Sequence, residues 1–133
     1  MANFSRELVH PSRIHPTPGF SHAAIAPVGR IAYVAGQVAL AEDFSVIGMG
    51  DLGEQTKAAM RNVKVVLDEI GASWGAVVRR TIYTLRPTEF EEITRAIEEV
   101  QGSSDHPAQT IVGVTGLAID GLLIEIEVTA HLS

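Results

Sequence analysis

The sequence predicts a single α+β domain, residues 1–133, in which two helices pack on one face of a single mixed β-sheet. Two segments, 52–70 and 90–100, repeat apolar side chains at helical spacing, whereas residues 122–132 alternate between apolar and polar side chains as a half-buried strand does. Two helices of about 15–20 residues can cover only one face of a sheet of roughly four to six strands. The other face must then be solvated or covered by another chain. The residues expected on it, such as Val34 and Ile111, favour another chain, and symmetric self-association is the commonest arrangement of that kind.

The first twenty residues are rich in proline. Pro11, Pro16 and Pro18 exclude a helix, so we expect an edge strand near residues 7–10 and then an extended segment. Residues 22–26 and 30–35 flank a Pro-Val-Gly sequence, which predicts a β-hairpin. The following loop, up to residue 50, contains two glycines and no clear periodicity.

Two capping boxes predict where the helices begin, one at residues 51–54 and one at residues 88–91. Gly71 and Gly102 predict where the helices end. Residues 77–85, between the helices, predict a strand, and Pro87 ends the run. The apolar faces of the two helices comprise Leu52, Ala59, Met60, Val63, Val66, Leu67 and Ile70, and Phe90, Ile93, Ile97 and Val100.

The last quarter of the chain predicts two further strands, 109–116 and 122–132, joined by an Asp-Gly turn. Glu125 and Glu127 share the polar side of the second strand, about 7 Å apart. In a simple hairpin, Gln109 and Glu125 are about four residues out of register, on the order of 13 Å. They could then share a pocket only across its width or between subunits. The residues expected on the uncovered face of the sheet are Val34, Ile111, Gly113 and Leu123.

The composition excludes several classes of function. The formal charge is −6 and no basic run is present, which argues against binding to nucleic acid or to an anionic membrane. No apolar run reaches the length of a membrane span, and the N-terminal residues lack the layout of a signal peptide. There is no cysteine, and the five histidines lack the paired spacing of a zinc motif. We expect a cytoplasmic protein with no metal and no cofactor.

Several separated segments resemble the Rid (YjgF-like) family. They are residues 20–23 (Phe-Ser-His-Ala), 33–37 (Tyr-Val-Ala-Gly-Gln), 55–63 (Gln-Thr-Lys-Ala-Ala-Met-Arg-Asn-Val), 107–110 (Pro-Ala-Gln-Thr), 112–114 (Val-Gly-Val) and 124–127 (Ile-Glu-Ile-Glu). The resemblance implies the fold shared with a bacterial-type chorismate mutase and a homotrimer with small-molecule clefts between neighbouring subunits. The best-known members hydrolyse reactive imines or enamines, such as 2-aminoacrylate, to a keto acid and ammonia.

The resemblance also implies site residues. Glu125 matches the glutamate that positions or activates water, so it is the expected catalytic residue. Gly36 and Gln37 match the Gly-Gln that follows the third strand of the family. Thr94 falls near a family asparagine, and Ile111 completes this part of the expected substrate-binding set.

Two further substrate-binding positions depart from the family pattern. Gln109 stands where the active deaminases have an arginine that binds the substrate carboxylate, and Phe20 stands where the family has a tyrosine. A guanidinium offers a charged, bidentate contact that a neutral amide does not. The chain therefore looks like a member outside the classical deaminase branch.

Two functional hypotheses remain open. One is a trimeric hydrolase of an imine, enamine or related reactive metabolite, whose substrate lacks the usual carboxylate or is held by another cation such as Arg30, Arg80 or Arg86. The other is a non-catalytic small-molecule-binding or regulatory module that uses the same clefts, which the loss of polar groups at Gln109 and Phe20 favours. Separately, Glu125 and Glu127 could simply line a solvated sheet face. A ribonuclease or translation inhibitor has no support in a net charge of −6.

Overall fold

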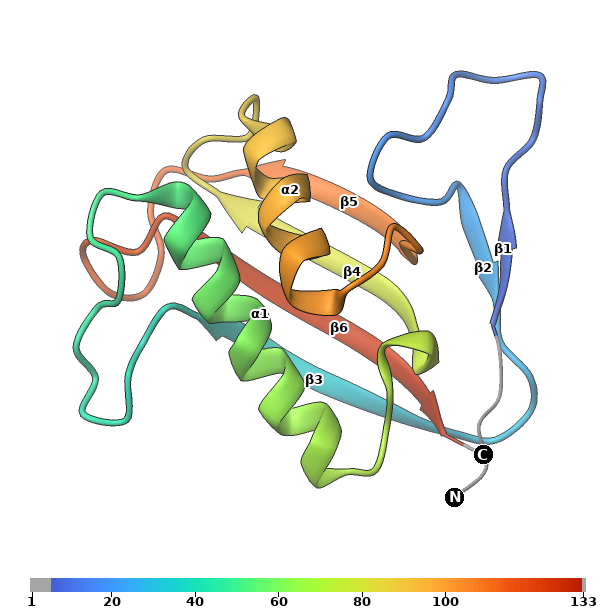
Figure 1. Ribbon diagram of the computed structural model, residues 1–133, viewed down its shortest axis with the longest axis horizontal. Helices are drawn as coiled ribbons and strands as arrows, with labels where there is room; N and C mark the ends of the chain where they lie inside the picture. The colour runs from blue at the N-terminus through green and yellow to red at the C-terminus, as the bar shows by residue number, and fades with distance from the viewer. Residues whose placement is uncertain (1–5, 133) are drawn as a thin grey trace.

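The computed structural model describes residues 6–132 and has two layers, a four-stranded mixed sheet and two helices that cover one of its faces (Figure 1). A two-stranded sheet lies beside these layers. In chain order the elements are β1 (Glu7–Val9), β2 (Ala23–Ile25), β3 (Arg30–Val38), α1 (Leu52–Glu69), the short 3-10 helix η1 (Trp74–Ala76), β4 (Val77–Thr84), α2 (Phe90–Gln101), β5 (Ala108–Gly113) and β6 (Ile124–Leu132). The predicted α+β fold is confirmed, and the signal-peptide prediction concerns residues 1–5, which lie outside the described part.

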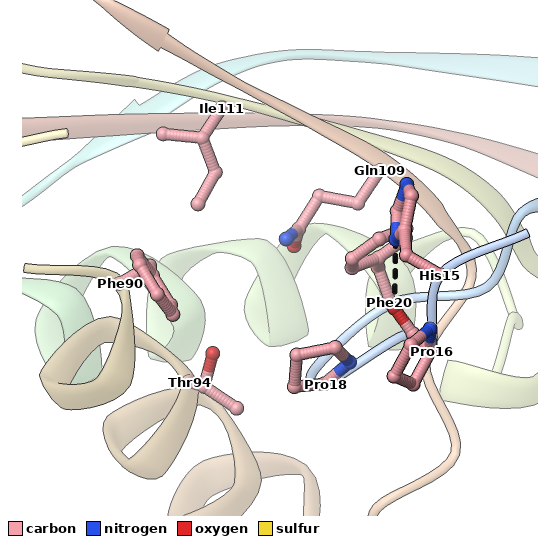
Figure 2. A pocket seen from close by; sticks show the side chains of 8 residues that line it. All are labelled: His15, Pro16, Pro18, Phe20, Phe90, Thr94, Gln109 and Ile111. Atoms are coloured by element: carbon pink, nitrogen blue, oxygen red, sulfur yellow. Dashed lines mark hydrogen bonds between the residues drawn. The ribbon is translucent and has the colours of Figure 1, made fainter. Parts of the chain in front are cut away.

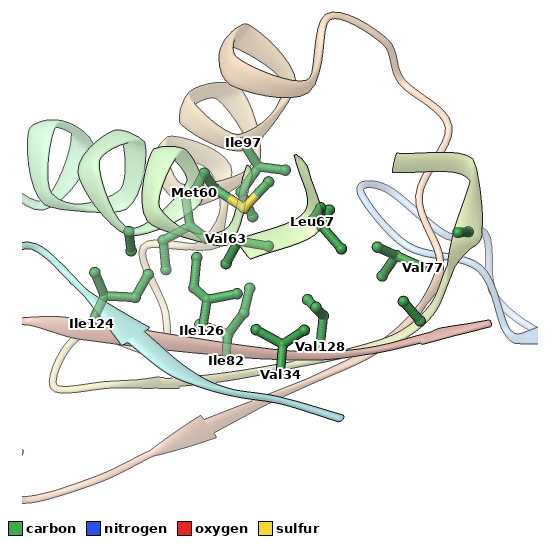
Figure 3. Packing of buried hydrophobic residues seen from close by; sticks show 14 of the residues in the cluster. Val34, Met60, Val63, Leu67, Val77, Ile82, Ile97, Ile124, Ile126 and Val128 are labelled. Atoms are coloured by element: carbon green, nitrogen blue, oxygen red, sulfur yellow. The ribbon is translucent and has the colours of Figure 1, made fainter. Parts of the chain in front are cut away.

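Strand β6 is central to the main sheet, whose order is β3-β6-β4-β5. It pairs antiparallel with both β3 and β4. Its predicted alternation is confirmed, because Ile124, Ile126 and Val128 are buried against the helices (Figure 3). Glu125 and Glu127 alternate with them and line a cavity on the other face. Each large apolar side chain that is fully buried contributes about 1.5–3 kcal/mol, so this strand is a principal source of the core's stability.

The predicted hairpin between the last two strands is wrong. β5 runs parallel to β4, and β4 lies between β5 and β6. The reason is that α2 connects β4 to β5, and a strand–helix–strand connection usually places its two strands parallel and adjacent. The chain does turn at Gly121, where φ is 96°, but residues 114–123 then carry it past β4 to the centre of the sheet.

The predicted hairpin of residues 22–26 and 30–35 is also wrong. β2 pairs antiparallel with β1 in the small sheet, whereas β3 pairs with β6 in the main sheet. Gly29 allows the chain to pass from one sheet to the other, because a Cβ at this position would overlap the backbone oxygen of Leu132. The strand expected near residues 7–10 is confirmed as β1.

The two helices begin differently. Asp51 is the N-cap of α1, and its Oδ1 accepts a hydrogen bond from the backbone N–H of Glu54 at 3.0 Å, as predicted. The reciprocal half of the predicted box is not formed, because the backbone N–H of Asp51 donates to the backbone oxygen of Gly48. The capping box predicted at residues 88–91 is wrong, because the N-cap of α2 is Glu89 and makes no side-chain capping bond. Acidic side chains in the first turn of α2 stabilise its N-terminus instead, through their interaction with the helix dipole.

The uncovered face of the sheet is not built from the apolar residues expected there. Side chains that pair across neighbouring strands point to the same side of a sheet, so the true strand order changes the assignment. Ile31 and Tyr33 lie on the uncovered face and are 54% and 79% exposed. The residues expected there lie on or beside the covered face instead: Val34, Ile111, Gly113 and Leu123. Within residues 6–132, no helix has the length and apolar character needed to cross a membrane.

Candidate functional site

A cavity of about 500 Å³ lies on the helix side of the sheet, where α2, β5 and the loop of residues 15–20 meet (Figure 2). We call it the α2–β5 pocket. It is lined by His15, Pro16, Pro18, Phe20, Phe90, Thr94, Gln109 and Ile111. Four residues predicted to bind substrate, Phe20, Thr94, Gln109 and Ile111, therefore lie together. The volume is within the range of about 300–1,000 Å³ that is typical of small-molecule sites.

Gln109 places a polar group inside this largely apolar pocket, and Figure 2 shows its side chain reaching toward the middle of the cavity. Its Oε1 accepts a hydrogen bond from Nε of Arg80, on the neighbouring strand β4. Arginine can only donate hydrogen bonds, so this contact determines which end of the amide is the oxygen. The Nε2 group makes no hydrogen bond with a residue of the described range 6–132.

Arg80 is 2% exposed, and a series of hydrogen bonds between side chains holds it in place. Its Nη2 donates to Nδ1 of His106 at 2.9 Å, and Nε2 of His106 lies 2.6 Å from Oε2 of Glu98. Because Nδ1 must accept, the ring hydrogen is on Nε2 and is donated to Glu98. The contact between His106 and Glu98 is therefore a hydrogen bond that a neutral imidazole donates to the carboxylate, and not an ion pair.

The pKa values of these groups agree with that arrangement. Burial lowers the pKa of His106, the hydrogen bond to Glu98 opposes this effect, and the charge of Arg80 adds to it. Burial also lowers the pKa of Arg80, to about 9. At neutral pH the imidazole is neutral and the guanidinium keeps its charge.

A second cavity, of about 410 Å³, opens on the uncovered face. We call it the open-face cleft. It is lined by Gly36, Tyr83, Val114, Gly116, Leu117, Ala118, Glu125 and Glu127. Glu125 lies over Gly36, since a Cβ at Gly36 would be 2.6 Å from Cδ of Glu125. Gly36 belongs to an irregularity of β3 between Val34 and Gln37, and such bulges commonly redirect side chains beside functional sites.

The two carboxylates of the open-face cleft differ in their contacts. The Tyr83 hydroxyl donates a hydrogen bond to Oε1 of Glu127, and this bond is the main cause that raises the pKa of Tyr83. Glu125 makes no side-chain hydrogen bond within residues 6–132. Its oxygens are therefore free to bind water or a ligand.

The predicted site residues lie on opposite faces of the sheet within one chain. Gln109 pairs with Arg80 on the covered face, whereas Glu125 pairs with Tyr83 on the uncovered face. Gln109 and Glu125 consequently do not meet in a single subunit. Gln37 lines neither cavity, and its Nε2 donates to the backbone oxygen of Ala35 at 3.2 Å.

Arg80, one of the three cations expected to hold the substrate, lines neither cavity and reaches the α2–β5 pocket only through Gln109. It is in phase with the buried Ile82 along β4, so its place in the alternation already indicates a buried cation that needs partners. Arg30 and Arg86, the other candidate cations, line neither cavity. Phe90, expected in the helix core, is 45% exposed and lines the α2–β5 pocket.

A metal site finds no support in the described range. No group of three His, Asp or Glu side chains in residues 6–132 is arranged to hold an ion. The histidines near the pocket instead organise the loop before β2, where Nε2 of His22 lies 3.0 Å from the backbone oxygen of His15.

Comparison with known proteins places this fold in a family. The family model described as Endoribonuclease L-PSP matches residues 10–132, so the chain belongs to that family. The resemblance to Rid (YjgF-like) proteins is thereby confirmed.

Several individual proteins are similar to this chain over most of its length. A RutC family protein of Pyrococcus abyssi is 35% identical over 116 residues, which cover 87% of this chain and 90% of the relative. The crystal structure of YyfB from Yersinia pestis, described as a protein of unknown function of the conserved Rid protein family, matches with a TM-score of 0.90 and 36% identity, over 97% of this chain and 100% of that one. The 3-aminoacrylate deaminase RutC of Acinetobacter baylyi is 28% identical over 117 residues, 88% of this chain and 91% of the relative.

Proposed function

We propose that the protein is a hydrolase that deaminates an imine, an enamine or a related small reactive metabolite at clefts between the subunits of a homotrimer. The observation that carries the proposal is the division of the site, because the α2–β5 pocket and Glu125 lie on opposite faces of one chain. A site that uses both is complete only where the pocket of one subunit meets the open-face cleft of the next. The relative named 3-aminoacrylate deaminase supports the reaction class.

The assembly in this proposal joins two unlike surfaces. β5 is an edge strand and carries the pocket, whereas the cleft lies on the uncovered face. Contacts between unlike surfaces close into a ring when the rotation between subunits allows it, and three is the number that the family resemblance implies. Ring closure would cover Ile31 and Tyr33, which are large side chains exposed on that face. Light scattering should give three times the chain mass, and a monomer would contradict the proposal. The proposal also includes the cytoplasmic location that the composition leads us to expect.

Glu125 is the general base in this proposal. It orients a water molecule and takes its proton while the water oxygen bonds to the imine carbon. The imine nitrogen takes up that proton, which gives a carbinolamine. Its hydroxyl then loses a proton and its nitrogen gains one as the C–N bond breaks, so that imine and water give a carbonyl compound and ammonia. An enamine first takes a proton on carbon to become the imine. The Gln109 amide and the backbone amide near Gly36 polarise the substrate in the same cleft.

A second candidate function is a binding or regulatory module that uses the same clefts without turnover. It is favoured by the absence of any Asp, Glu, Lys or Arg side chain among the residues that line the α2–β5 pocket, and by Phe20, which has no hydroxyl. Stabilisation against heat by a ligand, without turnover, would support this role.

The first experiment is a measurement of ammonia release from 2-imino acids and neutral imines that are generated in situ. We expect the native protein to accelerate release, and Glu125→Gln to lower kcat by about 100-fold or more, the usual contribution of a general base. Glu69→Gln is the control, because Glu69 is exposed at the end of α1 and lines neither cavity. If no imine is hydrolysed, or if Glu125→Gln has native kinetics, the hydrolase proposal fails.

A further inference from the structure

We infer that the α2–β5 pocket binds its ligand through an uncharged hydrogen-bond acceptor, such as a carbonyl, a carboxamide or a neutral imine nitrogen, attached to a compact apolar group. A carboxylate is not the group that this pocket selects. The inference deepens the proposed function and rests on it in one respect, namely that the α2–β5 pocket holds the substrate. It is carried by the contacts of Gln109, Arg80, His106 and Glu98.

The first step is the orientation of the Gln109 amide. Arg80 donates to Oε1, so the two hydrogens of Nε2 point away from Arg80. Nε2 has no acceptor within residues 6–132, although its side chain lines an apolar cavity. Gln109 is only half-buried, so water can reach this group in the free protein. A ligand that displaces the water without bringing an acceptor leaves the donor unpaired, which is unfavourable. A ligand with a hydrogen-bond acceptor would pair with Nε2 of Gln109, so the pocket favours such a ligand.

The second step is the charge of Arg80. Its guanidinium donates to Gln109, to His106 and, at 3.3 Å, to the backbone oxygen of Gly19. In the described range no carboxylate pairs with it directly, and Glu98 balances its charge through the neutral ring of His106. The ligand therefore meets no guanidinium, but a bond donated to Oε1 polarises the amide and strengthens Nε2–H as a donor.

The third step is the pocket wall. Phe20, Phe90 and Pro18 surround the amide with apolar surface (Figure 2). A carboxylate would lose its water there without a cation in direct contact, and an ion loses far more than a neutral polar group when it leaves water. A neutral acceptor requires one donor, which Gln109 supplies. The hydroxyl of Thr94 also lines the pocket and offers a second polar contact.

Three probes of nearly the same shape test the inference: benzamide, benzoate and the benzamidinium cation. Binding to the assembled native protein is measured by calorimetry or ligand-observed NMR at neutral pH. We expect benzamide to bind about tenfold more tightly than benzoate, and benzamidinium, which has no acceptor, to bind most weakly. In a two-dimensional NMR spectrum, benzamide should also shift the side-chain amide signal of Gln109, which is identified by its loss in Gln109→Glu.

The decisive variant is Gln109→Glu. It keeps an oxygen for Arg80 and adds a countercharge to that buried cation, so we expect the fold to be retained and Tm not to fall. It removes the Nε2 donor, and benzamide should then bind about tenfold more weakly. The matched control is Gln101→Glu, which adds the same charge at the far end of α2, outside the pocket, and should leave benzamide affinity unchanged.

Each outcome either supports or overturns the inference. Benzoate binding that equals or exceeds benzamide binding overturns it, as does benzamide binding that Gln109→Glu leaves unaltered, or no benzamide binding up to the solubility limit. These results are distinguishable from failure of the proposed function, because none of them measures turnover. Imine hydrolysis that requires Glu125 would stand without a preference for benzamide, and a preference for benzamide without hydrolysis would retain the ligand class in a binding module.

Discussion

The substitution Gly36→Ala tests the role of Glu125 without altering Glu125 itself. A Cβ at Gly36 would lie 2.6 Å from Cδ and 2.8 Å from Cγ of Glu125, and closer still to its Oε2. Ordinary van der Waals contact begins at 3.4 Å, so Cδ must move by about 0.8 Å to restore it. Gly36 is not among the glycines with positive φ, and alanine therefore fits its backbone without strain. The carboxylate should be displaced while the fold is retained.

A misplacement of about 1 Å at a reacting group can cost roughly 100-fold in rate. We expect Gly36→Ala to lower kcat for ammonia release by about 10- to 100-fold, with little change in Tm. Gly75→Ala is the matched control, since a Cβ there would meet only ordinary contacts, the closest at 3.6 Å. Native kcat in Gly36→Ala, in a protein where Glu125→Gln is inactive, would refute the reasoning. A fall in Tm as large as that of a core deletion would mean that the substitution damages the fold.

Three further predictions concern stability. Ile126→Ala, at a position with 0% exposure, should lower the free energy of unfolding by about 2–5 kcal/mol in urea denaturation. Asp51→Ala should cost about 1 kcal/mol, because the N–H of Glu54 loses its acceptor; an unchanged midpoint would contradict that role. The lowered pKa of His106 means that the unfolded state binds a proton where the folded state does not, so stability should decline as the pH falls below the ordinary value of about 6.5. His106→Gln should flatten this decline between about pH 8 and 5, and an unaltered slope would show that other groups cause it.

The sequence by itself determined the covered face of β6 and of α1. In β6, apolar side chains such as Ile126 and Val128 alternate with polar ones, and this alternation requires one apolar face whatever strand lies alongside. The helical spacing of Met60 and Val63 does the same for α1, and Asp51 marks its start. These features are local, because they depend on the period of a single element and on side chains a few positions apart.

Only the tertiary structure decided which strands are neighbours, and this pairing decides the site. Periodicity says which way a side chain points but not which strand lies beside it, so the insertion of β4 between β5 and β6 was not predictable from an Asp-Gly turn. That insertion places Gln109 beside Arg80 on the covered face and leaves Glu125 on the other. A buried cation contacts partners from other parts of the chain, and the link from Arg80 through His106 to Glu98 exists only when β4, α2 and the loop before β5 have packed together.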